Sequence, residues 1–175
     1  MSVETLVIII ISLIVLTGGI TLMYKWIYGA ESIKAGLDEQ TNSELERLLV
    51  EQGKQVALPR NVADLNRGEN HVFGIGILNV GEENNFWIEV GDPAAVDQTN
   101  SPISVIVDKS SWLLYNDQLI PLKQGQHVRE FINVKVPKED TPLGQYIFPV
   151  KVRYGTSPDE KQYGNTQKII INVKR

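Results

Sequence analysis

Hydrophobic and polar positions follow two different periods along this chain. The 20 residues from Thr5 to Tyr24 carry no charge, and as a helix they would measure roughly 30 Å, the thickness of a bilayer's hydrocarbon. From Lys25 to about Gly53, apolar or small residues recur every three or four positions between charged ones, which predicts an amphipathic continuation in phase with the first run. We therefore expect a long N-terminal α-helix over residues 1–53, hydrophobic over 5–24 and amphipathic over 25–53.

Beyond Gly53 the period changes to two, which is typical of half-buried strands. Clear alternation covers residues 73–78, 86–90, 132–136, 146–154 and 169–173, and weaker strands are expected near 55–58, 103–108 and 111–115. Gly, Pro and Asn turn signals separate these segments. The pattern predicts an immunoglobulin-like sandwich of seven or eight antiparallel strands over residues 54–175, and hence an α+β fold for the whole chain.

The uncharged run differs from a secretory signal peptide, whose apolar core is shorter and follows a basic front. Here the run follows Met-Ser-Val-Glu, without Lys or Arg, so we expect a retained transmembrane-type helix. Its amphipathic continuation would pack either on its own domain or against copies of itself. Gly18 and Gly19 permit a kink or a close helix contact within the run.

Gly74 and Gly76 are expected to face away from the predicted core on one strand. Bare backbone there would let a neighbouring element approach closely, such as a helix of the same or another subunit. Local tolerance of glycine in a strand is an equally good explanation.

Charge and motifs argue against several classes of function. The 17 Lys and Arg residues are scattered through a chain of net charge −4, which argues against nucleic-acid binding. No Gly-x-Ser-x-Gly, His-Glu-x-x-His or P-loop pattern occurs. His71 and His127 each follow a Leu-x-x-Gly turn, but one pair of histidines without cysteine or a carboxylate cluster falls short of a metal set. We expect no enzyme activity, no metal and no cofactor.

Two resemblances follow from these residues. The stretch from Leu65 to Val173, with Leu78-Asn79-Val80-Gly81, Val136-Pro137 and Gly144-Gln145-Tyr146, resembles the immunoglobulin-like modules of archaeal and bacterial surface proteins. The N-terminal third is similar to the type IV pilin superfamily, which includes archaeal pilins and archaellins. It shares with them an acidic residue, here Glu4, an uncharged helix, an amphipathic extension and a β head.

The second resemblance implies a structural subunit of an archaeal cell-surface filament that is inserted in the membrane before assembly and then polymerises with itself. The helices would form the filament core and the sandwich heads its outside. In that core Glu4 would pair with a free α-amino group at Met1, or else lie at a solvated membrane boundary. The expected core residues are Met1, Glu4, Leu6, Ile10, Leu13, Leu16, Gly18, Gly19, Ile20, Met23, Trp26 and Ile27.

Two other functions remain open at this stage. One is a single-pass, membrane-anchored sandwich that binds the cell envelope, as in accessory or stator components of the archaellum. The other is an anchored enzyme or solute binder. The long amphipathic extension favours the filament, because a membrane anchor alone does not need it.

Overall fold

The computed structural model describes residues 39–97, 99, 101–103, 108–139, 141–156 and 159–174, and these belong to one compact unit, Leu37–Arg175. The elements run in the order α2 (Glu39–Glu46), η1 (Arg47–Glu51), β1 (Val56–Ala57), β2 (Val62–Asn66), β3 (Asn70–Leu78), β4 (Asn84–Val90), β5 (Ala94–Val96), α3 (Lys109–Trp112), β6 (Leu113–Tyr115), β7 (Ile120–Leu122), β8 (His127–Lys135), β9 (Gly144–Tyr154) and β10 (Lys161–Lys174).

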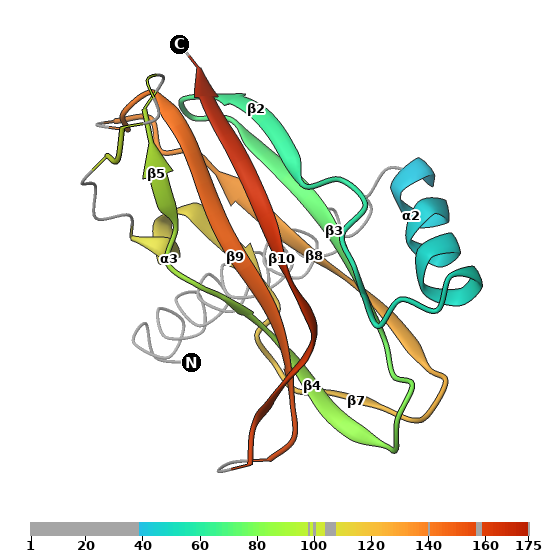
Figure 1. Cartoon of the computed structure of the whole chain (residues 1–175). Coiled ribbons are helices and arrows are strands. Elements are labelled where there is room, and N and C mark those ends of the chain that lie inside the picture. Colours follow the sequence, from blue (N-terminus) through green and yellow to red (C-terminus); the bar gives the residue numbers. More distant parts are fainter. Residues whose placement is uncertain are drawn as a thin grey trace, which may run out of the picture. The chain divides into compact units, whose positions relative to one another are not determined.

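The strands form two sheets that pack face to face as a β-sandwich. Sheet A has the order β1-β3-β8-β6, and sheet B has the order β2-β10-β9-β4-β7, with β5 also paired to β9. Figure 1 shows β9 and β10 of sheet B crossing in front of β8 and β3 of sheet A. Buried and partly buried residues alternate along β9 from Tyr146 to Val152, so that every second side chain points into the space between the sheets.

The chain changes sheets between β1 and β2. Strand β1 pairs antiparallel with β3 at one edge of sheet A, whereas β2 pairs parallel with the C-terminal half of β10 in sheet B. The connection, residues 58–61, contains Pro59, and the parallel pairing begins where the Ile170 amide donates to the Asn61 carbonyl at 2.7 Å. The short segment from β1 to β2 therefore supplies an edge strand to each of the two sheets.

Aromatic side chains dominate one end of the core. Trp112 lies against the rings of Tyr146 and Phe148, with ring centroids 4.7 and 5.8 Å apart. The Tyr146 hydroxyl donates to the Pro142 carbonyl at 2.9 Å, four residues upstream. This is the tyrosine-corner arrangement of immunoglobulin-like sandwiches, and it fixes the turn into β9.

The α+β prediction is wrong, because strands make up most of the described residues and no long N-terminal helix is among the described elements. The helix before the sandwich is described from Glu39 to Glu51 only, and its final turn is a π-helix, η1. The described residues form ten strands where seven or eight were expected, because β2, β5 and β7 show no clear alternation. Most of the strand expected near 103–108 lies outside the described residues. The fold is a mainly β sandwich.

The prediction of a transmembrane helix is also overturned. Among the described residues, no helix has the length and apolar character needed to span a bilayer. We therefore drop the membrane-inserted state before assembly and the single-pass anchor. The uncharged run on which both rested, residues 5–24, lies outside the described residues.

Candidate functional site

A second apolar cluster forms where α2 and η1 pack on the outer face of sheet A. Leu45 and Leu49 are fully buried there, and Ala57 of β1 is 2% exposed. Leu48 and Leu78 complete this cluster at its margin. We call these five residues, together with Gly76, the helix seat. The cluster is separate from the main core between the sheets.

Gly76 makes the close approach of the helix possible. A Cβ at this position would lie 2.5 Å from Leu49 Cδ1 and 3.1 Å from Leu45 Cδ2, so no larger residue fits without displacing the leucines. Gly74, two residues earlier on the same face of β3, is also buried, and its cross-strand neighbour Phe131 is 7% exposed.

The π-turn sets how the helix ends. The Gln52 amide donates to the Arg47 carbonyl, and the Lys54 amide donates to the Leu48 carbonyl, both at 3.1 Å. Gly53 then takes a left-handed conformation with φ of 62°, which glycine adopts without steric cost. The chain therefore turns sharply from the helix into β1, which pairs with β3 beneath it.

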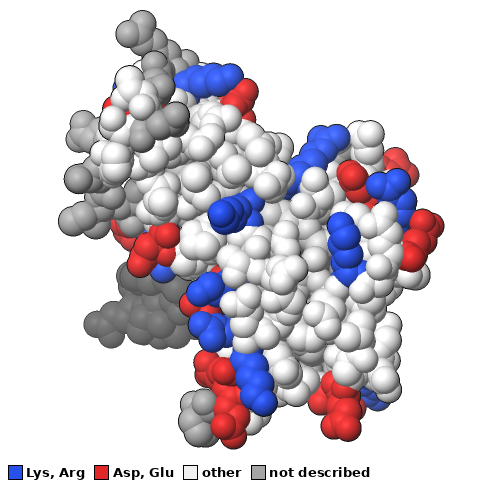
Figure 2. All heavy atoms as spheres, viewed as in Figure 1, with Lys and Arg blue, Asp and Glu red and all other residues white. Residues whose placement is uncertain are grey.

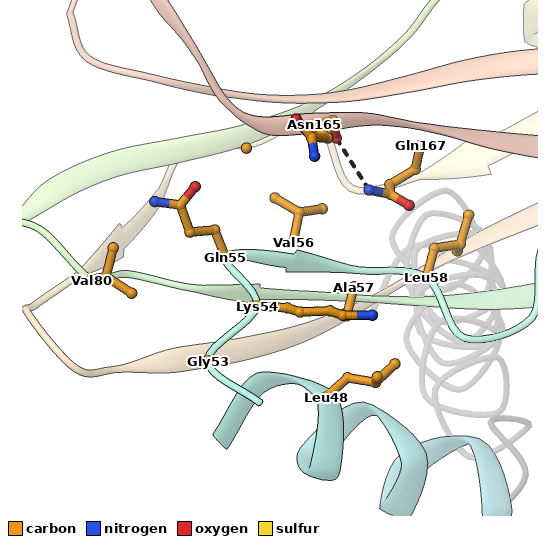
Figure 3. A pocket seen from close by; sticks show the side chains of 11 residues that line it. Leu48, Gly53, Lys54, Gln55, Val56, Ala57, Leu58, Val80, Asn165 and Gln167 are labelled. Atoms are coloured by element: carbon orange, nitrogen blue, oxygen red, sulfur yellow. Dashed lines mark hydrogen bonds between the residues drawn. The ribbon is translucent and has the colours of Figure 1, made fainter. Parts of the chain in front are cut away.

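A pocket of about 560 Å³ opens beside the helix seat, between the edge of β1 and β10 (Figure 3). Its lining comprises Leu48, Gly53, Lys54, Gln55, Val56, Ala57, Leu58, Val80, Gly164, Asn165 and Gln167. Lys54 is the one ionisable side chain among these lining residues, so the pocket offers no pair of groups for acid–base chemistry.

The β10 wall of this pocket is a bulge. The register between β10 and β9 shifts between Tyr163 and Gln167, and Gly164 has a φ of 64°. Gln162 Nε2 donates to the Gly164 carbonyl, and Gln167 Nε2 donates to the Asn165 carbonyl (Figure 3 shows the second bond). Side chains thus occupy carbonyls that an added strand would need, which protects this edge.

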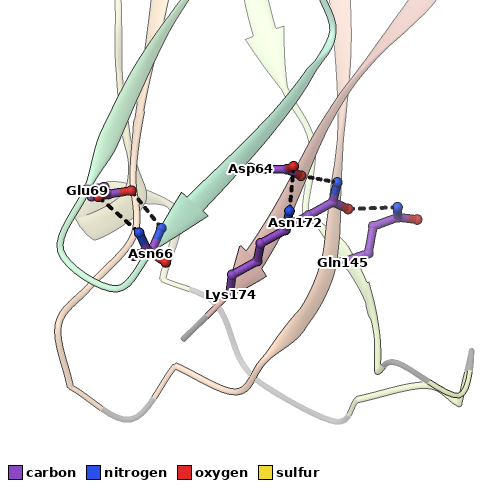
Figure 4. A network of polar contacts seen from close by, with 6 residues as sticks. All are labelled: Asp64, Asn66, Glu69, Gln145, Asn172 and Lys174. Atoms are coloured by element: carbon purple, nitrogen blue, oxygen red, sulfur yellow. Dashed lines mark hydrogen bonds and ion pairs between the residues drawn. The ribbon is translucent and has the colours of Figure 1, made fainter.

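A polar network holds the parallel joint between β2 and β10 (Figure 4). Asp64 of β2 accepts hydrogen bonds from Lys174 Nζ at 2.6 Å and Asn172 Nδ2 at 2.7 Å, and Gln145 donates to Asn172. The hydrogen bonds from Lys174 and then Asn172 lower the pKa of Asp64. Beyond the end of β2, two bonds from Asn66 lower the pKa of Glu69. The network is structural.

The two histidines lie at opposite ends of the β3–β8 pair. His71 is paired with Val134, and His127 is paired with Leu78. Seven residue steps along β3 separate the two positions, or roughly 23 Å at strand rise. Within the described part of the chain no three His, Cys, Asp or Glu side chains gather as metal ligands.

Glu130 is the one buried side chain in the described residues with an unpartnered polar atom. It is 6% exposed and lies opposite Ile75 on the inward face of β8. Its Oε1 accepts a long hydrogen bond of 3.4 Å from Asn116 Nδ2, and its Oε2 has no partner. Sequence alternation did not single out this residue, because a glutamate in a strand ordinarily faces solvent.

The expected filament-core residues all lie outside the described part of the chain: Met1, Glu4, Leu6, Ile10, Leu13, Leu16, Gly18, Gly19, Ile20, Met23, Trp26 and Ile27. Of the predicted site residues, the structure describes Gly74 and Gly76. The leucines that meet Gly76 appeared in the sequence as part of an amphipathic stripe, without an indication of which surface they cover.

Comparisons with known proteins find likeness in structure alone. No family model matches the chain, and no curated protein matches its sequence. A family 123 glycoside hydrolase from Clostridium perfringens aligns over 65% of this chain and 23% of its own length, with 12% identity and a TM-score of 0.45. The seventh PapD-like domain of human CEP192 aligns over 69% and 84%, with 11% identity and a TM-score of 0.46.

A chain of the CsuC–CsuE chaperone–adhesin complex from Acinetobacter baumannii pili aligns over 68% of this chain and 57% of its own length. The identity is 11% and the TM-score is 0.40.

Proposed function

We propose that this chain is a structural subunit of a filament, in the manner of type IV pilins and archaellins. Its uncharged N-terminal run associates with the same run of other copies, and the β-sandwich lies on the outside of the polymer. The observation that carries the proposal is the 20-residue uncharged stretch, Thr5 to Tyr24, which precedes the sandwich domain in the sequence.

The physical argument concerns apolar surface. Some 20 mostly apolar side chains in a row are poorly soluble in water, and burial stabilises them by roughly 25 cal/mol per Å², which amounts to tens of kcal/mol before entropy is subtracted. Association with identical runs removes that surface from water in every copy at once. The result is a polymer that dissociates very slowly.

The helix seat supports a structural role. Leu45 and Leu49 bury the apolar side of α2 and η1 on sheet A, so residues 39–51 are fixed to the sandwich and belong to the same compact unit. The sandwich can thus present one defined surface, which includes α2 and η1, to neighbouring copies in a filament.

Negative-stain electron microscopy of the purified full-length chain tests the proposal. The wild-type chain should form filaments of uniform width, and Leu13→Asp, which introduces a charge into the uncharged run, should abolish them. Leu119→Asp is the matched control, because Leu119 is 61% exposed in the sandwich, and this variant should assemble normally. Monodisperse wild-type particles under all conditions would refute the proposed function.

A further inference from the structure

We propose that the outer face of sheet B is the docking surface for α2 and η1 of a second copy of this chain. The inference rests on the proposed function and adds to it a contact between sandwiches. It follows from the complementary charge of two surfaces that lie on opposite layers of the same molecule.

The first surface is an apolar row across four strands of sheet B. Val62 pairs with Ile170, Ile170 pairs with Ile147, and Ile147 pairs with Ala94, so the four side chains stand side by side on one face. At about 4.8 Å per strand the row is about 14 Å long. It faces outward, since Val62 is 50% exposed and Ala94 is also exposed.

The charged neighbours of this apolar row include Asp64 and Glu89, which are paired with Lys174 and Arg153, and two lysines. Lys168 stands two residues before Ile170 on the same face of β10, and Lys151 stands four residues after Ile147 on β9. Neither lysine forms an ion pair within the described part of the chain. Figure 2 views the molecule from this side and shows Lys and Arg side chains spread over a largely uncharged face.

The second surface is the outward side of α2 and η1. From residue 39 to residue 51 the chain carries four glutamates against one arginine. Glu46 and Glu51 are exposed without an ion partner in the described structure, and Val50 between them is 56% exposed. On this surface Val50 lies between two unpaired acidic side chains, while Arg47 is paired with Glu44, so its unpaired charge is opposite to that of the two lysines on sheet B.

The positions of the two surfaces determine what kind of contact they make. α2 and η1 pack on β1 and β3 of sheet A, whereas the apolar row belongs to sheet B. Because the two surfaces lie on opposite layers of the sandwich, they cannot contact each other within one molecule. A contact between them is heterologous, and a contact of this type propagates along a filament of copies wherever its rotation does not close a ring.

Charge reversal with rescue tests the contact in the full-length chain. Lys151→Glu with Lys168→Glu, and separately Glu46→Lys with Glu51→Lys, should each raise the critical concentration for assembly at least about tenfold, because like charges then face each other. The chain that carries all four changes should recover wild-type assembly. The matched control is Lys123→Glu with Lys135→Glu, two exposed lysines outside both surfaces, and it should assemble as the wild type does.

Cross-linking locates the contact directly. A carbodiimide joins an ammonium and a carboxylate that are in contact, and an equal mixture of unlabelled and ¹⁵N-labelled chains identifies links between copies by mass spectrometry. We expect mixed-isotope links between Lys151 or Lys168 and Glu46 or Glu51. Such links should be absent from either charge-reversed pair and restored in the chain with all four changes.

The outcomes separate this inference from the proposed function. Filaments that form equally well in every charge variant, without these cross-links, would overturn the docking surface and leave the filament proposal intact. The docking surface would also be overturned if the chain with all four substitutions showed the sum of the assembly defects of the two double variants. A wild-type chain that neither polymerises nor gives mixed-isotope links would refute both proposals.

Discussion

Leu49 occupies the space that a side chain at Gly76 would need, and this relationship holds the last turn before β1 to sheet A. Gly76→Ala should lower the free energy of unfolding by about 1–3 kcal/mol, the usual cost of overpacking. Leu49→Ala should lower it by about 2–5 kcal/mol through the cavity that it leaves. In the double variant the added methyl group finds room, so the two losses should not add.

Urea unfolding of the four chains in this cycle measures the coupling. Gly81→Ala is the control, because the nearest atom to a Cβ there is Asn79 Oδ1 at an ordinary 3.7 Å. Strictly additive losses for Gly76 and Leu49 would show that the helix does not rest on this glycine.

Tyr163 joins the two sheets through its hydroxyl group. The hydroxyl donates to the Leu78 carbonyl at 2.7 Å and accepts from the Val80 amide at 3.0 Å. Tyr163→Phe should lower the free energy of unfolding by about 1–3 kcal/mol, because two backbone groups lose their partner. Tyr154→Phe, whose ring packs against the same Phe86, should cost much less, since no hydrogen bond of its hydroxyl is present in the described structure. Equal losses in thermal unfolding would contradict this assignment.

The stability of the sandwich should depend on His71 between neutral and mildly acid pH. Burial, and then the positive charge of Arg60, lower the pKa of His71 below its ordinary value of 6.5. The unfolded chain therefore binds the proton first, so this contribution is complete above pH 6.5 and is lost as pH falls through the lowered pKa of the folded state.

Chemical unfolding at several pH values between 8 and 5 checks this dependence. His71→Gln should flatten the loss of stability below pH 6.5, whereas the same change at the exposed His127 should retain it. The pKa values of the carboxyl groups of Asp64, Glu69 and Asp97 are also lowered, from ordinary values of 3.8 and 4.5 that already lie below pH 5, so these groups leave this window clear. An unchanged slope in His71→Gln would disprove the role of this histidine.

Glu130 should be replaceable with a gain in stability. Its Oε2 is buried without a partner, and an incompletely hydrogen-bonded carboxylate in a core is costly. Glu130→Gln removes the charge and preserves the shape, so the free energy of unfolding at pH 7 should rise by about 1 kcal/mol. Glu82→Gln, on an exposed turn, should have no such effect. A clear loss of stability in Glu130→Gln would instead show that the carboxylate has a role in the native state.

The sequence predicted those strands that bury one face, because their hydrophobic and polar residues alternate. The alternation from Tyr146 to Tyr154 predicted β9 correctly because it is paired on both sides and packs on one face. Strand β2 was missed because Leu65 is its one buried residue and its pairing partner, β10, lies about a hundred residues away in the sequence. Local pattern contains no information about such long-range pairing.

The contacts of the helix seat could not be predicted from local sequence pattern either. The leucine stripe was visible, but the surface that receives it depends on the register of β1 with β3, which places Ala57 opposite Gly76. Glu130 was missed for a related reason, since its burial comes from its place opposite Ile75 and from Asn116 in a separate loop. The filament function rests on residues outside the described structure and stays a prediction.

The switch of the chain from β1 to β2 has a mechanical consequence. Strands β2 and β10 run side by side in the same direction, so a pull on the N-terminal end of β2 and the C-terminal end of β10 loads them lengthwise. Five residue pairs, from Val62 with Ile170 to Asn66 with Lys174, then resist together and do not peel apart one by one. A force that pulls these two strand ends apart therefore acts on all five pairs at once, and the β2–β10 joint resists it as a unit.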